Sequence, residues 1–295
     1  MTNYYSKTAV ILLLITYFLF SAHFSNAQGW QKTIDKIDLM IEVGDYTKAD
    51  KQIQKFIAKT TKKHGESNKY KAIGLIKNAK NKIGLGLLKD VEQQIGSGIE
   101  MAINSADISP QDLGSLYQES TEIMILFGNY LKAEELLKLA SDSFKNGNLL
   151  DENISSQLDV LNARILTGKG YYAKAIDLIN EKLPFYSQRL VEATGNKEIK
   201  KSKRDYGYML LMKANSLRLM GNYRSSDSAF VYTTNWISDN LSKADLLYSQ
   251  SQYLNAKLLE ENGLNEDALV KFYQKAYNNS LRKYSAAHYI NILIQ

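Results

Sequence analysis

Cysteine is absent from this chain of 295 residues, and proline occurs only twice, at Pro110 and Pro184. Without a thiol the chain can form no disulfide, offer no thiolate to zinc and carry no lipid on a processed N-terminal cysteine. With so little proline, long helices are seldom interrupted, and the lack of any long low-complexity tract argues against disorder. These absences together predict an ordered, largely helical protein without thiol chemistry.

Motifs of catalytic or metal sites are also missing. Past residue 27 the histidines are His64 and His288, far apart in the sequence and without the HExxH spacing of a zinc site. The run at residues 168–170 lacks the further glycine and the Ser or Thr of a phosphate-binding loop, and the Ser280–Lys283 spacing lacks a companion Lys-Thr-Gly motif. We therefore predict that the protein is not an enzyme and has no catalytic residue, metal site or cofactor.

Residues 1–27 have the pattern of a secretory signal peptide. A lysine precedes an apolar run at residues 9–20, and Ser25-Asn26-Ala27 places small residues one and three positions before Gln28. The run is too short for a comfortable membrane span, although an uncleaved anchor is the alternative. We expect cleavage after Ala27, which leaves residues 28–295 as an exported repeat domain, periplasmic or associated with the cell surface.

Charge is mild overall and concentrated in one segment. The whole chain has 37 bases and 31 acids, a formal charge of +6. Residues 196–204 contain five bases and one acid, the steepest charge on the chain. One interpretation is a docking loop for an acidic partner, formed by Lys200, Lys201, Lys203 and Arg204; the alternative is a solvated loop between repeats. Nucleic acid is not expected as a partner, because the protein is exported and its net charge is small.

Six glycines recur along the chain at nearly constant spacing. They are Gly44, Gly86, Gly128, Gly170, Gly221 and Gly263, and the intervals are 42 residues except for one of 51 before Gly221. Small or slim residues stand seven before and five after each glycine, and mostly large apolar residues stand four before and nine after. Intervals of three and four on either side of a turn are the period of a helix with one buried face. Each repeat is therefore predicted to be a helical hairpin, closely packed at the small residues.

The turns resemble those of the tetratricopeptide repeat (TPR) family, with Gly-Asp-Tyr-x-x-Ala at residues 44–49, Gly-Asn-Tyr-x-x-Ala at 128–133 and variants at 170–175 and 221–226. The resemblance covers nearly all of residues 30–279. It departs from the family in repeat length, which is about 34 residues in TPRs, and in the aromatic of the first helix, which only Tyr117 approximates. It implies an all-α fold, an α–α superhelix or TPR-like solenoid of six helical hairpins plus a terminal helix at residues 281–295. A plain helical bundle is the alternative, and it would need no in-phase repeat.

In this family the concave face presents the residues ten, six and three positions before the turn glycine, so the resemblance implies a largely apolar binding groove. The uncharged candidates are Ile34, Ile76, Ile83, Gln118 and Tyr253. The charged candidates are Asp38, Lys80, Glu122, Arg164 and Lys257, of which the first four alternate in sign. These charges set the register of a bound partner, or they pair between neighbouring helices to set the register of the repeats; the sequence leaves both uses open.

The predicted function is an exported, non-catalytic TPR-like scaffold that binds a protein or peptide in this groove, as one component of an envelope assembly. Contact with a membrane is expected only indirectly, through that partner, and no metal is expected. The alternative is the extracytoplasmic sensory domain of a longer receptor, because the terminal helix leaves its apolar residues without a partner hairpin. A sugar-binding lipoprotein built on similar repeats is disfavoured by the missing cysteine.

Overall fold

The computed structural model describes residues 29–282 and residue 284. Throughout this part of the chain the regular structure is helical, without a strand, which confirms the predicted all-α fold. The predicted signal peptide, and all but three residues of the predicted terminal helix, lie outside the described residues. The first described helix occupies residues 29–42. It is followed by α2 (Tyr46–His64), α3 (Lys69–Gly84), α4 (Val91–Ile103), α5 (Pro110–Phe127), α6 (Tyr130–Asn146), α7 (Glu152–Gly168), α8 (Tyr172–Glu192), α9 (Asn196–Leu219), α10 (Tyr223–Asn240), α11 (Leu246–Glu261), α12 (Asn265–Ala268), the π-helical turn η1 (Leu269–Tyr273) and α13 (Gln274–Ser280).

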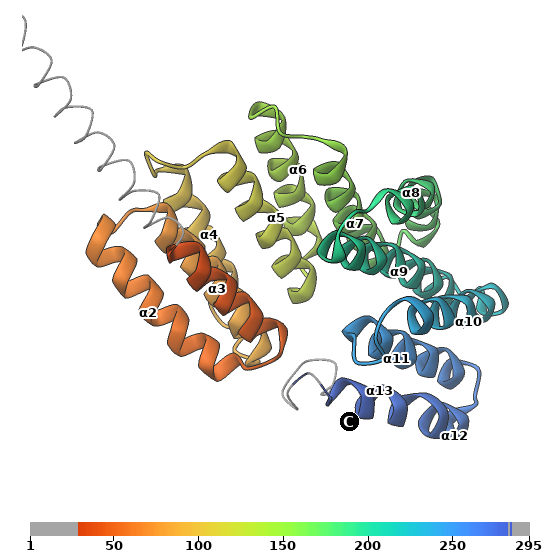
Figure 1. Cartoon of the computed structure of the whole chain (residues 1–295). Helices are drawn as coiled ribbons and strands as arrows, with labels where there is room; N and C mark the ends of the chain where they lie inside the picture. Colours follow the sequence, from red (N-terminus) through yellow and green to blue (C-terminus); the bar gives the residue numbers. More distant parts are fainter. Residues whose placement is uncertain (1–28, 283, 285–295) are drawn as a thin grey trace, which may run out of the picture.

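Consecutive helices pair as hairpins that turn at the predicted glycines (Figure 1). Within the described residues, hairpin 1 joins residues 29–42 to α2, hairpins 2 to 5 join α3–α4, α5–α6, α7–α8 and α9–α10, and hairpin 6 joins α11 to the α12–η1–α13 segment. All six turn glycines have φ between 71° and 85°, a left-handed conformation that is costly for a residue with a Cβ. The N–H of Gly128 donates to the Ile125 carbonyl at 3.2 Å and that of Asn129 to the Met124 carbonyl at 2.9 Å. This is the Schellman arrangement that closes a helix at a glycine.

The residues seven before and five after each turn glycine form a buried seam along the whole array. All twelve have an exposed fraction of 0%: Ile37, Ala49, Ala79, Val91, Thr121, Ala133, Ala163, Ala175, Ala214, Ser226, Ala256 and Ala268. Slim side chains let paired helices approach each other, and the larger apolar residues beside them fill the space between hairpins. Because the same positions must be slim in every hairpin, slim residues recur there in the sequence and indicate the hairpins.

Tyrosines that follow the turn glycines join some hairpins tightly to the next. A Cβ added to Gly84 would overlap the Tyr46 ring, and a Cβ added to Gly168 would overlap the Tyr130 ring. Each of these two glycines lies two residues before the turn glycine of the following hairpin, so the ring packs directly on bare helix backbone. The same position holds Leu126, Leu219 and Glu261 elsewhere. Ring-on-glycine packing therefore occurs at the junctions of hairpins 1 with 2 and 3 with 4.

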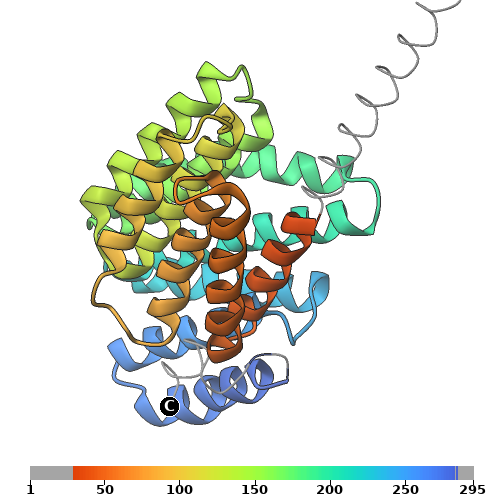
Figure 2. The same ribbon diagram turned by 90° about the vertical axis from the view of Figure 1, so that its left-hand side faces the viewer.

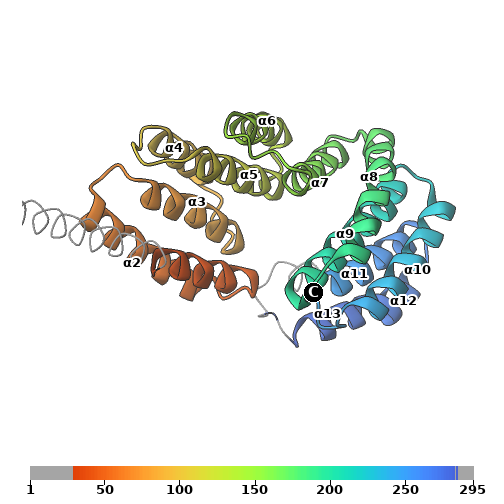
Figure 3. The ribbon, with the colours of Figure 1, turned by 45° about the horizontal axis from the view of Figure 1, so that its top comes forward.

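The hairpins stack into a curved array with its first helices on the inside. Helices α3, α5, α7, α9 and α11 contact one another in sequence, while α4, α6, α8 and α10 lie on the outside (Figure 3). Curvature brings the end of the helix at residues 29–42 near the beginning of α9, where Glu42 and Arg204 approach to 3.8 Å. The first hairpin therefore reaches the fifth across the mouth of the concave face, which we define as the inner surface formed by the first helices.

The longer interval before Gly221 is absorbed by helix and not by a loop, which corrects the expectation of a loop at residues 196–204 in both interpretations, docking and solvated. Helix α8 has 21 residues and α9 has 24, and their junction projects beyond the stack (Figure 2). Lysine, arginine and glutamate are good helix formers. The Glu198 carboxylate also accepts a hydrogen bond from the Thr194 N–H at 3.2 Å, which satisfies a backbone donor just before the helix begins.

Candidate functional site

Six charged side chains form two neighbouring groups of ion pairs across the first four inner helices. Lys77 on α3 lies 2.6 Å from Asp38 on the first helix and 2.7 Å from Glu119 on α5. Lys80 on α3 lies 2.9 Å from Glu122 on α5, which also approaches Arg164 on α7 at 3.8 Å. We call this set the ionic ladder: Asp38, Lys77, Lys80, Glu119, Glu122 and Arg164. With three acids and three bases, the ladder carries no net formal charge.

The sequence left open whether the charged candidates pair between neighbouring helices, and the ladder shows that they do. Glu122 contacts Arg164 as the register alternative expected, but the partner of Asp38 is Lys77 and not Lys80. Sequence reasoning missed Lys77 and Glu119. Both lie one helical turn before the expected positions, on the same face of their helices. Their separation of 42 residues and opposite charge were a usable signal in the sequence.

Pairing with bases keeps Glu122 ionised in spite of its burial. Burial, the largest influence on Glu122, would by itself raise its pKa, but Lys80 and Arg164 lower that pKa to about 2. The Glu122 side chain nevertheless keeps 39% of its surface exposed. Burial also raises the pKa of Asp38, an effect that Lys77 opposes and that Glu119 reinforces. The concave face therefore presents fixed charges that are surrounded by protein and still reached by water.

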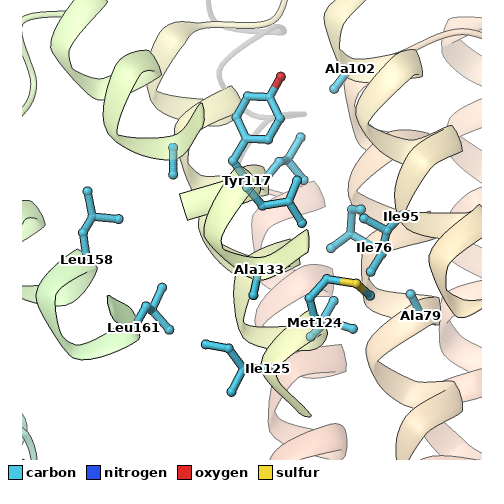
Figure 4. Packing of buried hydrophobic residues seen from close by; sticks show 14 of the residues in the cluster. Ile76, Ala79, Ile95, Ala102, Tyr117, Met124, Ile125, Ala133, Leu158 and Leu161 are labelled. Atoms are coloured by element: carbon cyan, nitrogen blue, oxygen red, sulfur yellow. The ribbon is translucent and has the colours of Figure 1, made fainter. Parts of the chain in front are cut away.

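The predicted apolar rows are partly core and not surface, which corrects part of the proposed groove. Ile76 has an exposed fraction of 0% and Ile34 is buried, whereas Ile83 is half-buried. Figure 4 shows Ile76 beside Ile95, Ala79 and Met124. A Cβ on Gly98 of α4 would lie 2.9 Å from the Ile76 Cδ1. Because α4 packs so closely on α3, Ile76 faces α4 and cannot touch a partner.

Polar and aromatic candidates remain accessible further along the concave face. Gln118 on α5 donates to the Gln157 side chain on α7 at 3.1 Å, and both are half-buried. In hairpin 6 the rings of Tyr253 and Tyr273 lie 5.8 Å apart. Lys257 lies 6.0 Å and 5.9 Å from their centroids and 3.0 Å from Glu260. The predicted residues thus fall into a polar region on hairpins 2 to 4 and an aromatic one on hairpin 6.

The basic segment of α9 lies at the mouth of the concave face. Arg204 Nε contacts Asp245 at 3.3 Å, and the Asp245 side chain is only 4% exposed, so the guanidinium is anchored to the start of α11. Its other side approaches Glu42 at 3.8 Å. Lys200 and Lys201 are exposed and Lys203 is half-buried. In contrast to Arg204, these three lysines have no carboxylate within 4.0 Å among the residues of 29–282.

The described part of the chain contains no group of three or more His, Asp or Glu side chains placed to hold a metal ion. None of its helices is both long and apolar enough to cross a membrane. A shallow depression lies outside the concave face, at the turn of hairpin 3, lined by Phe127, Gly128, Asn129, Tyr130, Leu131 and Lys169.

Comparison with known proteins shows the fold. No family model matches the sequence, and no curated protein does. Among solved structures, the crystal structure of NprR in complex with its cognate peptide NprX has a TM-score of 0.64 and 14% sequence identity, covering 98% of this chain and 80% of that chain. BtubC (BKLC) from P. vanneervenii has a TM-score of 0.45 and 12% identity, covering 86% of this chain and 89% of that chain. The likeness to NprR, with the hairpins described above, establishes a TPR-like helical solenoid.

Proposed function

We propose that the protein is a non-catalytic scaffold whose concave face binds a peptide or a peptide-like segment of a protein. The observation that carries the proposal is the ionic ladder, whose charged groups are enclosed by the curved array and yet accessible to water. NprR, which shares the fold, is seen in complex with its cognate peptide. A surface of this kind can surround an extended chain and meet it from several helices at once.

The inner helices offer a peptide both rigidity and hydrogen bonds. Ion pairs hold the first helices of hairpins 1 to 4 in register, which lowers the entropy that binding would have to overcome. A carboxamide has two N–H donors and two acceptor lone pairs. The single hydrogen bond between Gln118 and Gln157 therefore leaves both side chains with capacity to bind the backbone of a peptide that crosses α5 and α7.

Export is part of the same proposal and rests on the N-terminal sequence pattern. If residues 1–27 are removed during secretion, the scaffold works in the periplasm or at the cell surface, within an envelope assembly. N-terminal sequencing of the protein recovered from the envelope of its own cells tests this. A first residue of Gln28 supports export, whereas an intact Met1 in the soluble cell extract rejects it.

Peptide binding is tested by selecting displayed random twelve-residue peptides on the protein and measuring the affinity of the enriched sequences. Q118A/Q157A should weaken their binding by about tenfold or more, since two hydrogen bonds are lost. The matched control is Q54A/Q93A, which changes exposed glutamines on α2 and α4, outside the concave face. Binding that is equal in all three proteins, or the absence of any enriched peptide, rejects the proposed function.

A further inference from the structure

Charge is balanced within the ionic ladder but not within the basic segment of α9. In the ionic ladder every base lies within 4.0 Å of an acid, so its field largely cancels over the surface that a ligand would see. Lys200, Lys201 and Lys203 have no such partner in the described chain. We therefore expect α9, and not the ladder, to distinguish ligands by their charge.

This imbalance is large compared with the charge of the whole protein. Residues 189–205, which span the end of α8 and the beginning of α9, contain six bases and three acids, a net of +3, whereas all 295 residues sum to +6. Helix α2, outside the concave face, has six bases and one acid, but the basic excess beside the mouth belongs to this projecting element (Figure 2). The N-terminus of α9 adds the partial positive charge of its free N–H groups to the same place.

The location of the segment ties its charge to the concave face. Asp245 anchors Arg204, and Glu42 of hairpin 1 approaches the same guanidinium at 3.8 Å. Hairpin 1 and α9 thus face each other across the opening (Figure 3). Lys200, Lys201 and Lys203 lie within one helical turn of Arg204 on the same helix. A chain that leaves or enters the concave face at this mouth passes the lysines. A flat surface would not reach the same concavity, which favours a peptide over a membrane.

We propose that Lys200, Lys201 and Lys203, together with Arg204, recognise an acidic segment of the peptide bound by the concave face. This inference rests on the proposed function and specifies its ligand class: a peptide with Asp or Glu clustered toward one end. Ammonium groups would pair with its carboxylates at the mouth, while the remainder of the peptide crosses the inner helices. Glu42 then competes with the ligand, because its carboxylate occupies the open side of Arg204.

The peptide selection described above tests this inference when it is repeated on charge variants. Wild type should enrich Asp and Glu near one end of the selected peptides. K200E/K201E/K203E should lose that enrichment and bind an acidic wild-type-selected peptide roughly tenfold or more weakly at low salt, and added salt should shrink the difference. K200A/K201A/K203A, which preserves helix propensity, should show a smaller loss in the same direction. E42Q should bind the acidic peptide severalfold more tightly.

The control is K55E/K59E/K62E, which makes the same change in net charge on exposed positions of α2. It should keep wild-type affinity and the same acidic enrichment, whereas a loss equal to that of the α9 variant would reduce the effect to net charge and overturn the inference. Peptides that are enriched without acidic bias, or that bind the α9 variants unchanged, overturn the inference and leave the proposed function standing. Failure to enrich any peptide on wild type rejects both. Charge-dependent binding of the α9 segment to phosphatidylglycerol vesicles, with no acidic bias in peptides, would assign the segment to a membrane instead.

Discussion

The inner faces of hairpins 1 to 4 and of hairpins 5 and 6 use charge in different ways. In the first region lysines on α3 each bridge toward an acid on the next inner helix, and the set is neutral as a whole. In the second, Arg204 and Arg218 on α9 are tied to Asp245 and Glu261 of hairpin 6, and surplus lysines remain beside them. The comparison teaches that charges on the inner helices can pair between repeats in one region and lie without a nearby carboxylate among the described residues in another.

Packing between neighbouring hairpins also differs between these two regions. Tyr46 and Tyr130 press on glycines of the following hairpin, which locks hairpin 1 to 2 and hairpin 3 to 4. The corresponding tyrosine of hairpin 5 is Tyr223, which is 38% exposed, and the residue at the glycine position of hairpin 6 is Glu261. The N-terminal region is therefore joined by both ion pairs and ring packing, whereas hairpins 5 and 6, as far as the chain is described, are joined by ion pairs without a ring packed on glycine.

The largest effect should come from removing the central lysine of the ladder. Lys77→Met leaves Asp38 and Glu119 facing each other without a base between them, and the Lys77 side chain is only 9% exposed. Loss of one partner of a buried ion pair should cost about 3 kcal/mol of unfolding free energy. Lys200→Met, on the exposed part of α9, should change stability by less than about 0.5 kcal/mol. Urea unfolding of both proteins measures the difference, and equal midpoints would mean that the ladder has no structural role.

A smaller loss is expected from filling one of the glycine positions under a tyrosine ring. Gly168→Ala forces the Tyr130 ring away from α7 and should destabilise the protein by about 1–3 kcal/mol. Gly96→Ala is the matched control, because that helical glycine has nothing within 4 Å of an added Cβ. It should stabilise by about 0.5–1 kcal/mol. Thermal unfolding that shifts both variants in the same direction would contradict the packing described here.

The smallest effect should appear as a dependence of stability on pH. The pKa of Glu122 is about 2 in the folded protein, below the value of 4.5 for a free glutamate. A lowered folded pKa contributes stability that is present above pH 4.5 and is lost as the pH falls toward 2. Glu122→Gln should lack this component, so that its stability falls less steeply than that of wild type over that window. Parallel acid unfolding curves would show that Glu122 is not held by Lys80 and Arg164.

Much of the fold could be read from the sequence, and much less of the site. Local sequence within each repeat was enough to predict the turn glycines, the small buried residues and the helical hairpins. The prediction of the site was wrong at three places. Ile76 is part of the core, the partner of Asp38 is Lys77, and residues 196–204 are helical. Whether one row of a helix is buried depends on how the helix is rotated about its axis relative to its neighbour. That rotation cannot be predicted from the sequence of a single repeat.

The sequence by itself determined where the helices end and which residues must be small, because a left-handed turn needs glycine and a close helix crossing excludes bulk. Both are properties of one position and its immediate neighbours. The tertiary structure alone decided which charges meet and which stay free, since the offset between inner helices sets the ion pairs and the curvature brings Glu42 to Arg204, 162 residues away in sequence. In that long-range geometry Lys200, Lys201 and Lys203 have no carboxylate within 4.0 Å among the described residues.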